Sequence, residues 1–239
     1  MRLYVIRHGH KAINEPGFEC AYNTPLSDTG REQAEHLASF LSGESIDILY
    51  SSCALRALET AEPVEAAIDV AWHVWPALSE FMGETWPDRR AAHGEDALPP
   101  VAWPTGQDVD TPATEELKTW DGNDYLLSSL PDRYPVELSQ PFPWPDAWWT
   151  AKEHQTRTVG AGAVALAYKG LAARHDETDR VAVVCHGNSG RALLAAHLGL
   201  ALERDWDFHF DNTGVTRVDD SGSIAYSNRT AHLPPELRV

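Results

Sequence analysis

Two apolar stretches of the sequence each end in a histidine followed by a glycine. Residues 3–6 lead into Arg7-His8-Gly9, and residues 181–185 lead into His186-Gly187-Asn188. Near-continuous apolar runs are typical of strands that are covered on both faces, and in such sheets ligands bind beyond the carboxyl ends of the strands. We therefore expect two buried strands that deliver an arginine and two imidazoles to a site.

Arg56 is a further candidate for a site that binds an anion. Residues 46–50 are predicted to form a strand, and a helix is predicted to begin at about Ala54, which places Arg56 in its first turn. Most arginines on exposed helices are only solvated. At the start of a helix that follows a strand, however, the guanidinium and the unpaired backbone N–H groups can point at the same anion.

Taken together, five groups of residues resemble the histidine phosphatase (phosphoglycerate mutase-like) superfamily. In chain order they are Arg7-His8-Gly9; Pro25-Leu26-Ser27 with Gly30 and Gln33-Ala34; Ser51-Ser52 with Arg56 and Thr60-Ala61-Glu62; Glu80; and His186-Gly187. The resemblance covers residues 1–86 and 155–233 and leaves the middle of the chain uncovered. It implies an α/β fold, a three-layer α/β/α sandwich with a mainly parallel sheet.

The resemblance also implies a phosphoryl transfer with five catalytic residues. His8 is expected to attack phosphorus and form a phosphohistidine, while Arg7 and Arg56 hold the phosphoryl oxygens. His186 is expected to donate to the phosphoryl group, and Glu80 to protonate the leaving group and then activate water. Glu84 is a weaker candidate for the carboxylate. No metal or other cofactor is expected.

Four more residues are predicted to contact the substrate: His10, Asn14, Gly187 and Asn188, the last through its backbone N–H. His10-Lys11 departs from the Glu or Gln followed by Thr or Ser that many relatives carry after Arg-His-Gly. This departure changes the charge beside the nucleophile and therefore bears on the choice of substrate.

The predicted function is hydrolysis of a phosphomonoester of a small molecule. Phosphoglycerate mutases carry a Glu-x-x-Tyr-Gly segment with basic residues after it, whereas this chain lacks the tyrosine and offers only Arg89-Arg90. Mutase-type phosphoryl transfer stays an alternative, as does a non-catalytic phosphate-binding module on the same fold. A third alternative is a metal-dependent hydrolase, because His8-Gly9-His10 resembles the zinc-binding pair of amidohydrolase barrels, but eight strand–helix units are not found.

The net charge of the chain limits the classes of partner that it is expected to bind. A net charge of -17 disfavours binding to nucleic acid or to anionic membranes, so the expected partner is a small-molecule phosphoester. The three cysteines have no motif spacing, and the first strand follows Met1-Arg2 directly, which leaves no room for a signal peptide. We therefore expect a cytoplasmic protein; the sequence says nothing of its oligomeric state.

Residues 81–150 differ from the rest of the chain. They hold six of the nine tryptophans, ten of the sixteen prolines, and 13 acidic against 4 basic residues. Prolines at this density exclude long helices, while disordered segments are poor in aromatic residues. We expect one domain over residues 1–239, with an irregular insertion or lid at about residues 81–150.

The remaining elements must position the catalytic residues. We expect a helix that is capped by Ser27 or Thr29 and ends near Gly43, and a closing hairpin at 215–226. A strand at 70–74 and helices at 158–174 and 189–198 complete the expected elements. Because both imidazoles must reach one phosphate, the strands before Arg7 and His186 should be adjacent, with the two rings closer than about 8 Å.

Overall fold

The computed structural model describes residues 1–14, 24–52, 54–78, 80, 125–126, 157–200 and 208–239. Its strands are β1 (Arg2–Arg7), β2 (Ile48–Ser51), β3 (Trp72–Val74), β4 (Tyr125–Leu126), β5 (Arg180–Cys185), β6 (Val215–Val218) and β7 (Ile224–Arg229). Its α-helices are α1 (Asp28–Leu41), α2 (Leu55–Ile68), α6 (Arg157–Arg174) and α7 (Gly187–His197). Its short 3-10 helices are η1 (Ala12–Asn14), η2 (Pro76–Leu78) and η5 (Pro235–Leu237).

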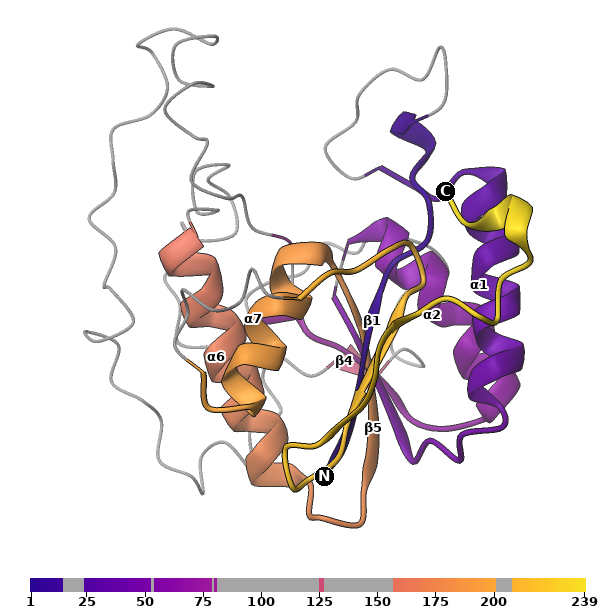
Figure 1. Ribbon diagram of the computed structural model, residues 1–239. Coiled ribbons are helices and arrows are strands. Elements are labelled where there is room, and N and C mark those ends of the chain that lie inside the picture. Colours follow the sequence, from indigo (N-terminus) through magenta and orange to yellow (C-terminus); the bar gives the residue numbers. More distant parts are fainter. Residues whose placement is uncertain (15–23, 53, 79, 81–124, 127–156, 201–207) are drawn as a thin grey trace, which may run out of the picture.

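The strands form a single sheet. Within the described ranges it has seven strands in the order β4-β3-β2-β5-β1-β6-β7. The four central strands are parallel to one another, and the three outer strands run antiparallel to their neighbours. Helices α6 and α7 cover one face of the sheet, and α1 and α2 cover the other (Figure 1). The predicted three-layer α/β/α fold and the closing hairpin are therefore confirmed.

The register of β1 and β5 places their ends side by side. The two strands pair in parallel from Arg2 with Arg180 to Arg7 with Cys185. His8 and His186 each follow the last pair by one residue, so they leave neighbouring strands at the same level. The predicted adjacency of the two strands is confirmed.

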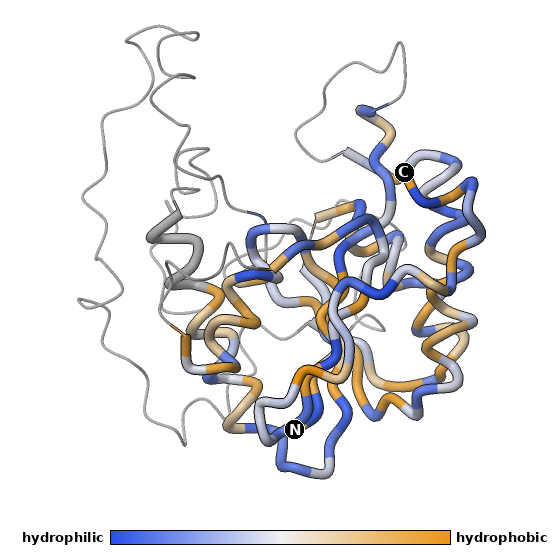
Figure 2. Tube along the Cα trace, viewed as in Figure 1, coloured by the Kyte–Doolittle hydropathy of each residue, from blue (hydrophilic) through white to orange (hydrophobic). Residues whose placement is uncertain are grey.

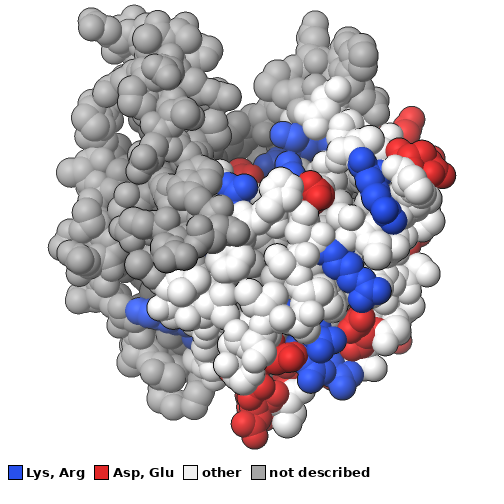
Figure 3. Space-filling view, in the orientation of Figure 1, with Lys and Arg blue, Asp and Glu red and all other residues white. Residues whose placement is uncertain are grey.

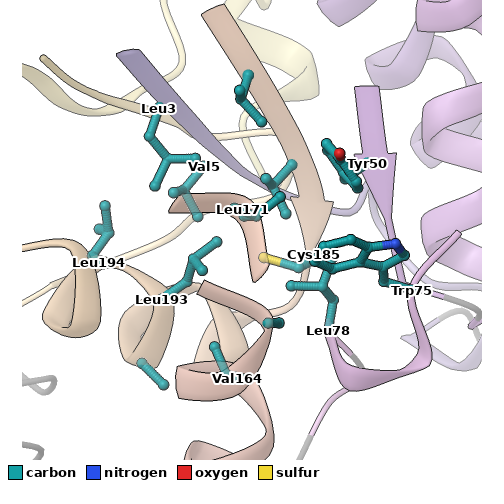
Figure 4. Packing of buried hydrophobic residues seen from close by; sticks show 14 of the residues in the cluster. Leu3, Val5, Tyr50, Trp75, Leu78, Val164, Leu171, Cys185, Leu193 and Leu194 are labelled. Carbon is teal, nitrogen blue, oxygen red and sulfur yellow. The ribbon is translucent and has the colours of Figure 1, made fainter. Parts of the chain in front are cut away.

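Both faces of β1 are apolar, because alternate side chains of a strand point to opposite faces. Leu3 and Val5 pack under α6 and α7 in the cluster that Figure 4 shows with Trp75 and Leu193. Tyr4 and Ile6 pack into a second cluster, under α1 and α2. In Figure 2 the apolar sides of the helices turn toward the sheet. Each fully buried large side chain contributes about 1.5–3 kcal/mol, which anchors the strands that end at the site.

The helix ends observed in the structure match the positions predicted from the sequence only in part. Ser27 caps α1, and its side chain accepts from the backbone N–H of Gly30 at 3.0 Å. Thr29 lies inside the helix, so the alternative in which Thr29 caps α1 is wrong. Helix α7 begins at Gly187, two residues before the predicted start, because His186 has the extended backbone of an N-cap residue.

The insertion expected at about residues 81–150 lies outside the described residues, apart from the two residues of β4, whose backbone pairs with β3. Among the described helices, none combines the length and apolar character needed to cross a membrane. On the described part of the face in Figure 3, charged side chains of both signs lie scattered among uncharged ones. The net charge of -17 is therefore not gathered into one acidic patch on that part of the surface.

Candidate active site

His8 and His186 face each other beyond the ends of β1 and β5. Their ring centroids lie 5.1 Å apart, and the rings are inclined at 62°. His8 is 2% exposed and His186 is 0% exposed. The sequence predicted that both imidazoles would lie within reach of one phosphate, and this geometry allows it.

The hydrogen bonds of His8 determine which of its nitrogens carries the proton. Its Nδ1 lies 2.7 Å from the carbonyl oxygen of Gly9. Because a carbonyl oxygen can only accept, Nδ1 must carry the hydrogen, and Nε2 keeps its lone pair. Burial lowers the pKa of His8 well below its ordinary value, and the positive charge of Arg56 lowers this pKa further. His8 is therefore neutral at pH 7, with Nε2 able to act as a nucleophile.

The backbone of the turn after His8 is fixed by neighbouring helices. The N–H of Gly9 donates to the hydroxyl of Thr60 at 3.0 Å, and the N–H of His10 donates to the side chain of Gln33 at 2.8 Å. A Cβ atom on Gly9 would lie 2.7 Å from the carbonyl oxygen of Gly30. Glycine at position 9 thus lets the turn lie directly against the start of α1, which holds His8 in place.

Arg7 and Arg56 supply positive charge to the two imidazoles. Arg7 donates through Nη1 to the carbonyl oxygen of Phe210 at 2.7 Å, while its buried Nε has no hydrogen-bond partner among the described residues. Arg56 is the second residue of α2, and its charge lowers the pKa of both histidines. Two guanidinium groups at this place can bind a phosphoryl group through charge-assisted hydrogen bonds.

His186 is held by a serine that the sequence did not single out for a role. Its Nε2 lies 2.6 Å from Oγ of Ser52, and its backbone N–H donates to Oγ of Ser189 at 3.1 Å. Burial lowers the pKa of His186 well below its ordinary value, and the positive charge of Arg56 and the nearness of the His8 ring, which disfavours a second proton, lower this pKa further. His186 is therefore also neutral near pH 7.

Glu80 contacts the start of α7. Its Oε1 accepts from the backbone N–H of Asn188 at 3.2 Å, two residues after His186. A helix N-terminus stabilises negative charge, so this contact draws the carboxylate to the site. The sequence predicted that the N–H of Asn188 would bind phosphate. In the structure Glu80 accepts from this group, so the phosphate contact of Asn188 stays a prediction.

The other predicted substrate contacts differ in their placement. Nδ1 of His10 lies 2.8 Å from Oγ of Ser27, the residue that caps α1, which gives this ring a structural contact. Asn14 is exposed at the end of η1. A Cβ atom on Gly187 would meet none of the described residues outside its own stretch of α7 within 4 Å. Substrate binding by His10, Asn14 and Gly187 stays a prediction.

Asn212 and Thr213 also hold the His8 turn, a role that no pattern in the sequence indicates. The side-chain amide of Asn212 donates to the carbonyl oxygen of His8 at 3.1 Å, and the N–H of Thr213 donates to that of Arg7 at 3.1 Å. Thr213 has a φ of 53°, which is uncommon for a β-branched residue. Strained backbone of this kind persists where the surroundings fix it, often at functional sites. From the sequence, the Asn-Thr-Gly segment indicates only a turn.

A zinc pair of the His-x-His type does not fit this geometry. The ring of His8 faces His186, whereas the ring of His10 contacts Ser27. Within the ranges that the structure describes, no group of three or more His, Cys, Asp or Glu side chains is placed to hold a metal ion. The described strands form an open sheet, with β4 at one edge and β7 at the other, and not the closed barrel of that alternative.

Known proteins share both the sequence pattern and the fold. A sequence model of the histidine phosphatase superfamily (branch 1) matches residues 3–121 and 114–224. Phosphoserine phosphatase 1 of Hydrogenobacter thermophilus is 24% identical over 245 residues, which cover 98% of this chain and 94% of that protein.

Two solved structures show a similar fold. Phosphoserine phosphatase from Entamoeba histolytica, in complex with 3-phosphoglyceric acid, has a TM-score of 0.58 at 20% identity and covers 98% of this chain and 99% of its own. Mycobacterial glucosyl-3-phosphoglycerate phosphatase has a TM-score of 0.59 at 21% identity and covers 96% of this chain and 99% of its own. With its two strand-end histidines, this protein belongs to branch 1 of the histidine phosphatase superfamily and is a phosphoric monoester hydrolase.

Proposed function

We propose that the protein hydrolyses a phosphomonoester of a small molecule through a phosphohistidine at Nε2 of His8. The observation that carries this proposal is the pair of buried, neutral imidazoles with ring centroids 5.1 Å apart, with two arginines beside them. A phosphoryl group that lies beside both rings meets a nucleophile in one and a hydrogen-bond donor in the other. Phosphoryl transfer depends mostly on such positioning and on stabilisation of charge.

In the first step, the lone pair on Nε2 of His8 forms a bond to phosphorus. The bond between phosphorus and the ester oxygen breaks, and the protonated carboxyl group of Glu80 gives its proton to that oxygen. The products of this step are the free alcohol and phosphohistidine 8. Arg7 and Arg56 bind the phosphoryl oxygens throughout, and His186 donates a hydrogen bond to them.

In the second step, water replaces the imidazole. The carboxylate of Glu80 takes a proton from the water, whose oxygen attacks phosphorus, and the bond from phosphorus to Nε2 breaks. Inorganic phosphate leaves, and His8 returns to its neutral state. Two displacements at phosphorus thereby replace one more difficult displacement.

The substrate class is proposed from the relatives. Phosphoserine phosphatase 1 matches 98% of this chain, and the two solved structures are named for phosphoserine and for glucosyl-3-phosphoglycerate. We therefore propose a small phosphorylated metabolite as substrate, and a screen should begin with phosphoserine, 3-phosphoglycerate and sugar phosphates. Release of inorganic phosphate from at least one of them is the expected result.

The covalent intermediate can be tested directly. After brief incubation with a 32P-labelled ester and a quench with alkali, the protein should retain label that is stable in base and lost in acid. His36→Ala serves as the matched control, because it removes an exposed imidazole on α1 and should leave the label in place. Label that persists in His8→Ala, or phosphoryl exchange between hydroxyls without net release of phosphate, would contradict the proposal.

A further inference from the structure

Ser52 is a buried hydroxyl in direct contact with the second imidazole of the site. Its Oγ lies 2.6 Å from Nε2 of His186, and both residues are 0% exposed. The backbone N–H of Ser52 donates to the carbonyl oxygen of Val184 at 3.0 Å, which ties the end of β2 to β5. The hydroxyl is therefore held in place by the two strands and not by a flexible loop.

The surroundings of Ser52 leave one place for its hydrogen. A hydroxyl has one hydrogen to donate and two lone pairs. Oγ of Ser52 already accepts from the backbone N–H of Ala54 at 3.3 Å. Among the described residues, Nε2 of His186 is the acceptor within reach of its hydrogen. A proton on Nε2 would leave that hydrogen buried without an acceptor, at a cost of about 1–3 kcal/mol.

The protonation of Nδ1, the other ring nitrogen of His186, follows from that of Nε2. Nδ1 is buried and makes no hydrogen bond among the described residues, although the side chain of His186 and the backbone N–H of Ser189 are arranged as in a capping box. If Nε2 accepts from Ser52, a neutral His186 must carry its hydrogen on Nδ1. That nitrogen can then donate to a phosphoryl oxygen, whereas an unprotonated Nδ1 would repel it.

We propose that Ser52 is a positioning residue that fixes the proton of His186 on Nδ1, and so makes this imidazole a hydrogen-bond donor to the phosphoryl group. The inference rests on the proposed role of His186 in phosphoryl transfer. Ser52 itself does not touch the reacting atoms; it acts through His186.

The proton position can be measured without any substrate. In full-length protein labelled with 15N at histidine, the His186 signals, assigned with a His186→Gln variant, should show a protonated Nδ1 and an unprotonated Nε2. In Ser52→Ala the two tautomers should both become populated. Ser51→Ala is the matched control, because the hydroxyl of Ser51 contacts Trp72 and the backbone of Ser52 but not His186. It should leave the tautomer unchanged.

Kinetics then separate positioning from packing. Ser52→Ala should lower kcat about tenfold with little change in KM, because the lost interaction acts in the transition state. Added to His186→Gln, the same substitution should have no further effect on kcat. Should Ser52→Ala fail to fold, Ser52→Cys, which is close in size and a weak donor, allows the same comparison.

The outcomes are distinct. An unchanged His186 tautomer in Ser52→Ala, or a protonated Nε2 in the unsubstituted protein, would overturn the role of Ser52 while phosphatase activity stood. A protein that hydrolyses no ester would reject the proposed function and leave the tautomer measurement intact. A tautomer change in Ser52→Ala with kcat unaffected would also overturn the inference.

Discussion

The turns after β1 and β5 have the same sequence pattern, a buried strand followed by His-Gly, but they hold their histidines in different ways. The ring of His8 is held through Nδ1 by a backbone carbonyl, that of Gly9. The ring of His186 is held through Nε2 by a side chain, that of Ser52. The residue after His8 enters a turn, whereas the residue after His186 begins α7.

This difference in hydrogen-bond partners suits one imidazole to act as a nucleophile and the other to act as a hydrogen-bond donor. A carbonyl oxygen forces the hydrogen onto Nδ1 of His8 and leaves a lone pair on Nε2, as a nucleophile requires. A hydroxyl can donate to Nε2 of His186 and leave a hydrogen on Nδ1, as a donor requires. Identical residue types can thus take different roles because their partners differ. Variants of the two turns should therefore not behave alike.

The largest expected effect is at the nucleophile. His8→Ala should lower kcat by at least on the order of 10³-fold, because the covalent route is lost, while His186→Ala should cost on the order of 10²-fold, because it removes one donor. Quenched-flow labelling checks the difference in kind: His186→Ala should still accumulate phosphohistidine and His8→Ala should not. Equal losses in both variants, with label absent from both, would show that the two turns are not specialised.

The sequence could predict most of this arrangement, because the relevant signals are local. The apolar runs before Arg7 and His186 and the strand–helix junction before Arg56 each indicate an element and its end. Parallel strands in an α/β sheet place these ends at one edge. The pairing of β1 with β5, 178 residues apart in the chain at Arg2 and Arg180, followed from the demand that both imidazoles reach one phosphate.

The next effect in size concerns Glu80, which accepts from the backbone N–H of Asn188 after His186 and interacts electrostatically with Arg7. Glu80→Gln keeps the size of the side chain and an acceptor for the N–H of Asn188, but it cannot donate and take back a proton. We expect kcat for alkyl esters to fall on the order of 10²–10³-fold. For p-nitrophenyl phosphate, whose leaving group needs no proton, the first step should fall much less.

Burst kinetics with the two esters provide the check. With p-nitrophenyl phosphate, Glu80→Gln should release p-nitrophenol rapidly in a first turnover and then stall, because water activation is also lost. A similar loss of the first-turnover rate with both esters would contradict the role of Glu80 as the acid. In that case Glu84, the weaker candidate, would be examined in the same way.

The contacts that the sequence could not predict are those between distant segments. The amide of Asn212 and the N–H of Thr213 bind the carbonyl oxygens of His8 and Arg7, more than 200 residues away. Gln33 links the N–H of His10 to the carbonyl oxygen of Leu237. Any Asn, Thr or Gln could make such contacts, so their residue types alone carry no signal; only the packing of the sheet decides which ones do.

A smaller effect is expected at Thr60, which links the His8 turn to α2. Its hydroxyl accepts from the N–H of Gly9 at 3.0 Å and donates to the carbonyl oxygen of Arg56 at 2.6 Å. Thr60→Val keeps the shape but leaves a buried N–H unpaired, so it should lower the free energy of unfolding by about 1–3 kcal/mol. We expect kcat to fall about tenfold as well, because His8 and Arg56 lose their common support.

Thr60→Ser is the matched control, because it keeps the hydroxyl and loses only a methyl group. Chemical denaturation and steady-state kinetics of both variants should place Thr60→Ser near the unsubstituted protein in activity. If Thr60→Val matched Thr60→Ser in both measurements, the link from Gly9 to α2 would have no part in holding the nucleophile.

The smallest effect expected is on the pH dependence of stability, and it tests what the two turns share. Burial lowers the pKa of both His8 and His186 well below 6.5, the ordinary value that an unfolded chain should show. Above pH 6.5 neither state binds a proton at these rings, so they contribute no pH dependence. As the pH falls below 6.5, the unfolded state takes up protons that the folded state does not, so the free energy of unfolding decreases. The slope is up to about 1.4 kcal/mol per pH unit for each histidine.

Denaturation of His8→Ala between pH 7 and pH 5 should therefore show a slope smaller by about that amount, and His186→Ala should behave alike. Thr60→Val, which disturbs the same turn without removing a titratable group, should keep the full slope. A slope in His8→Ala equal to that of the unsubstituted protein would mean that the folded protein protonates this ring as readily as the unfolded chain does, and His8 would then lack the neutral state that a nucleophile needs.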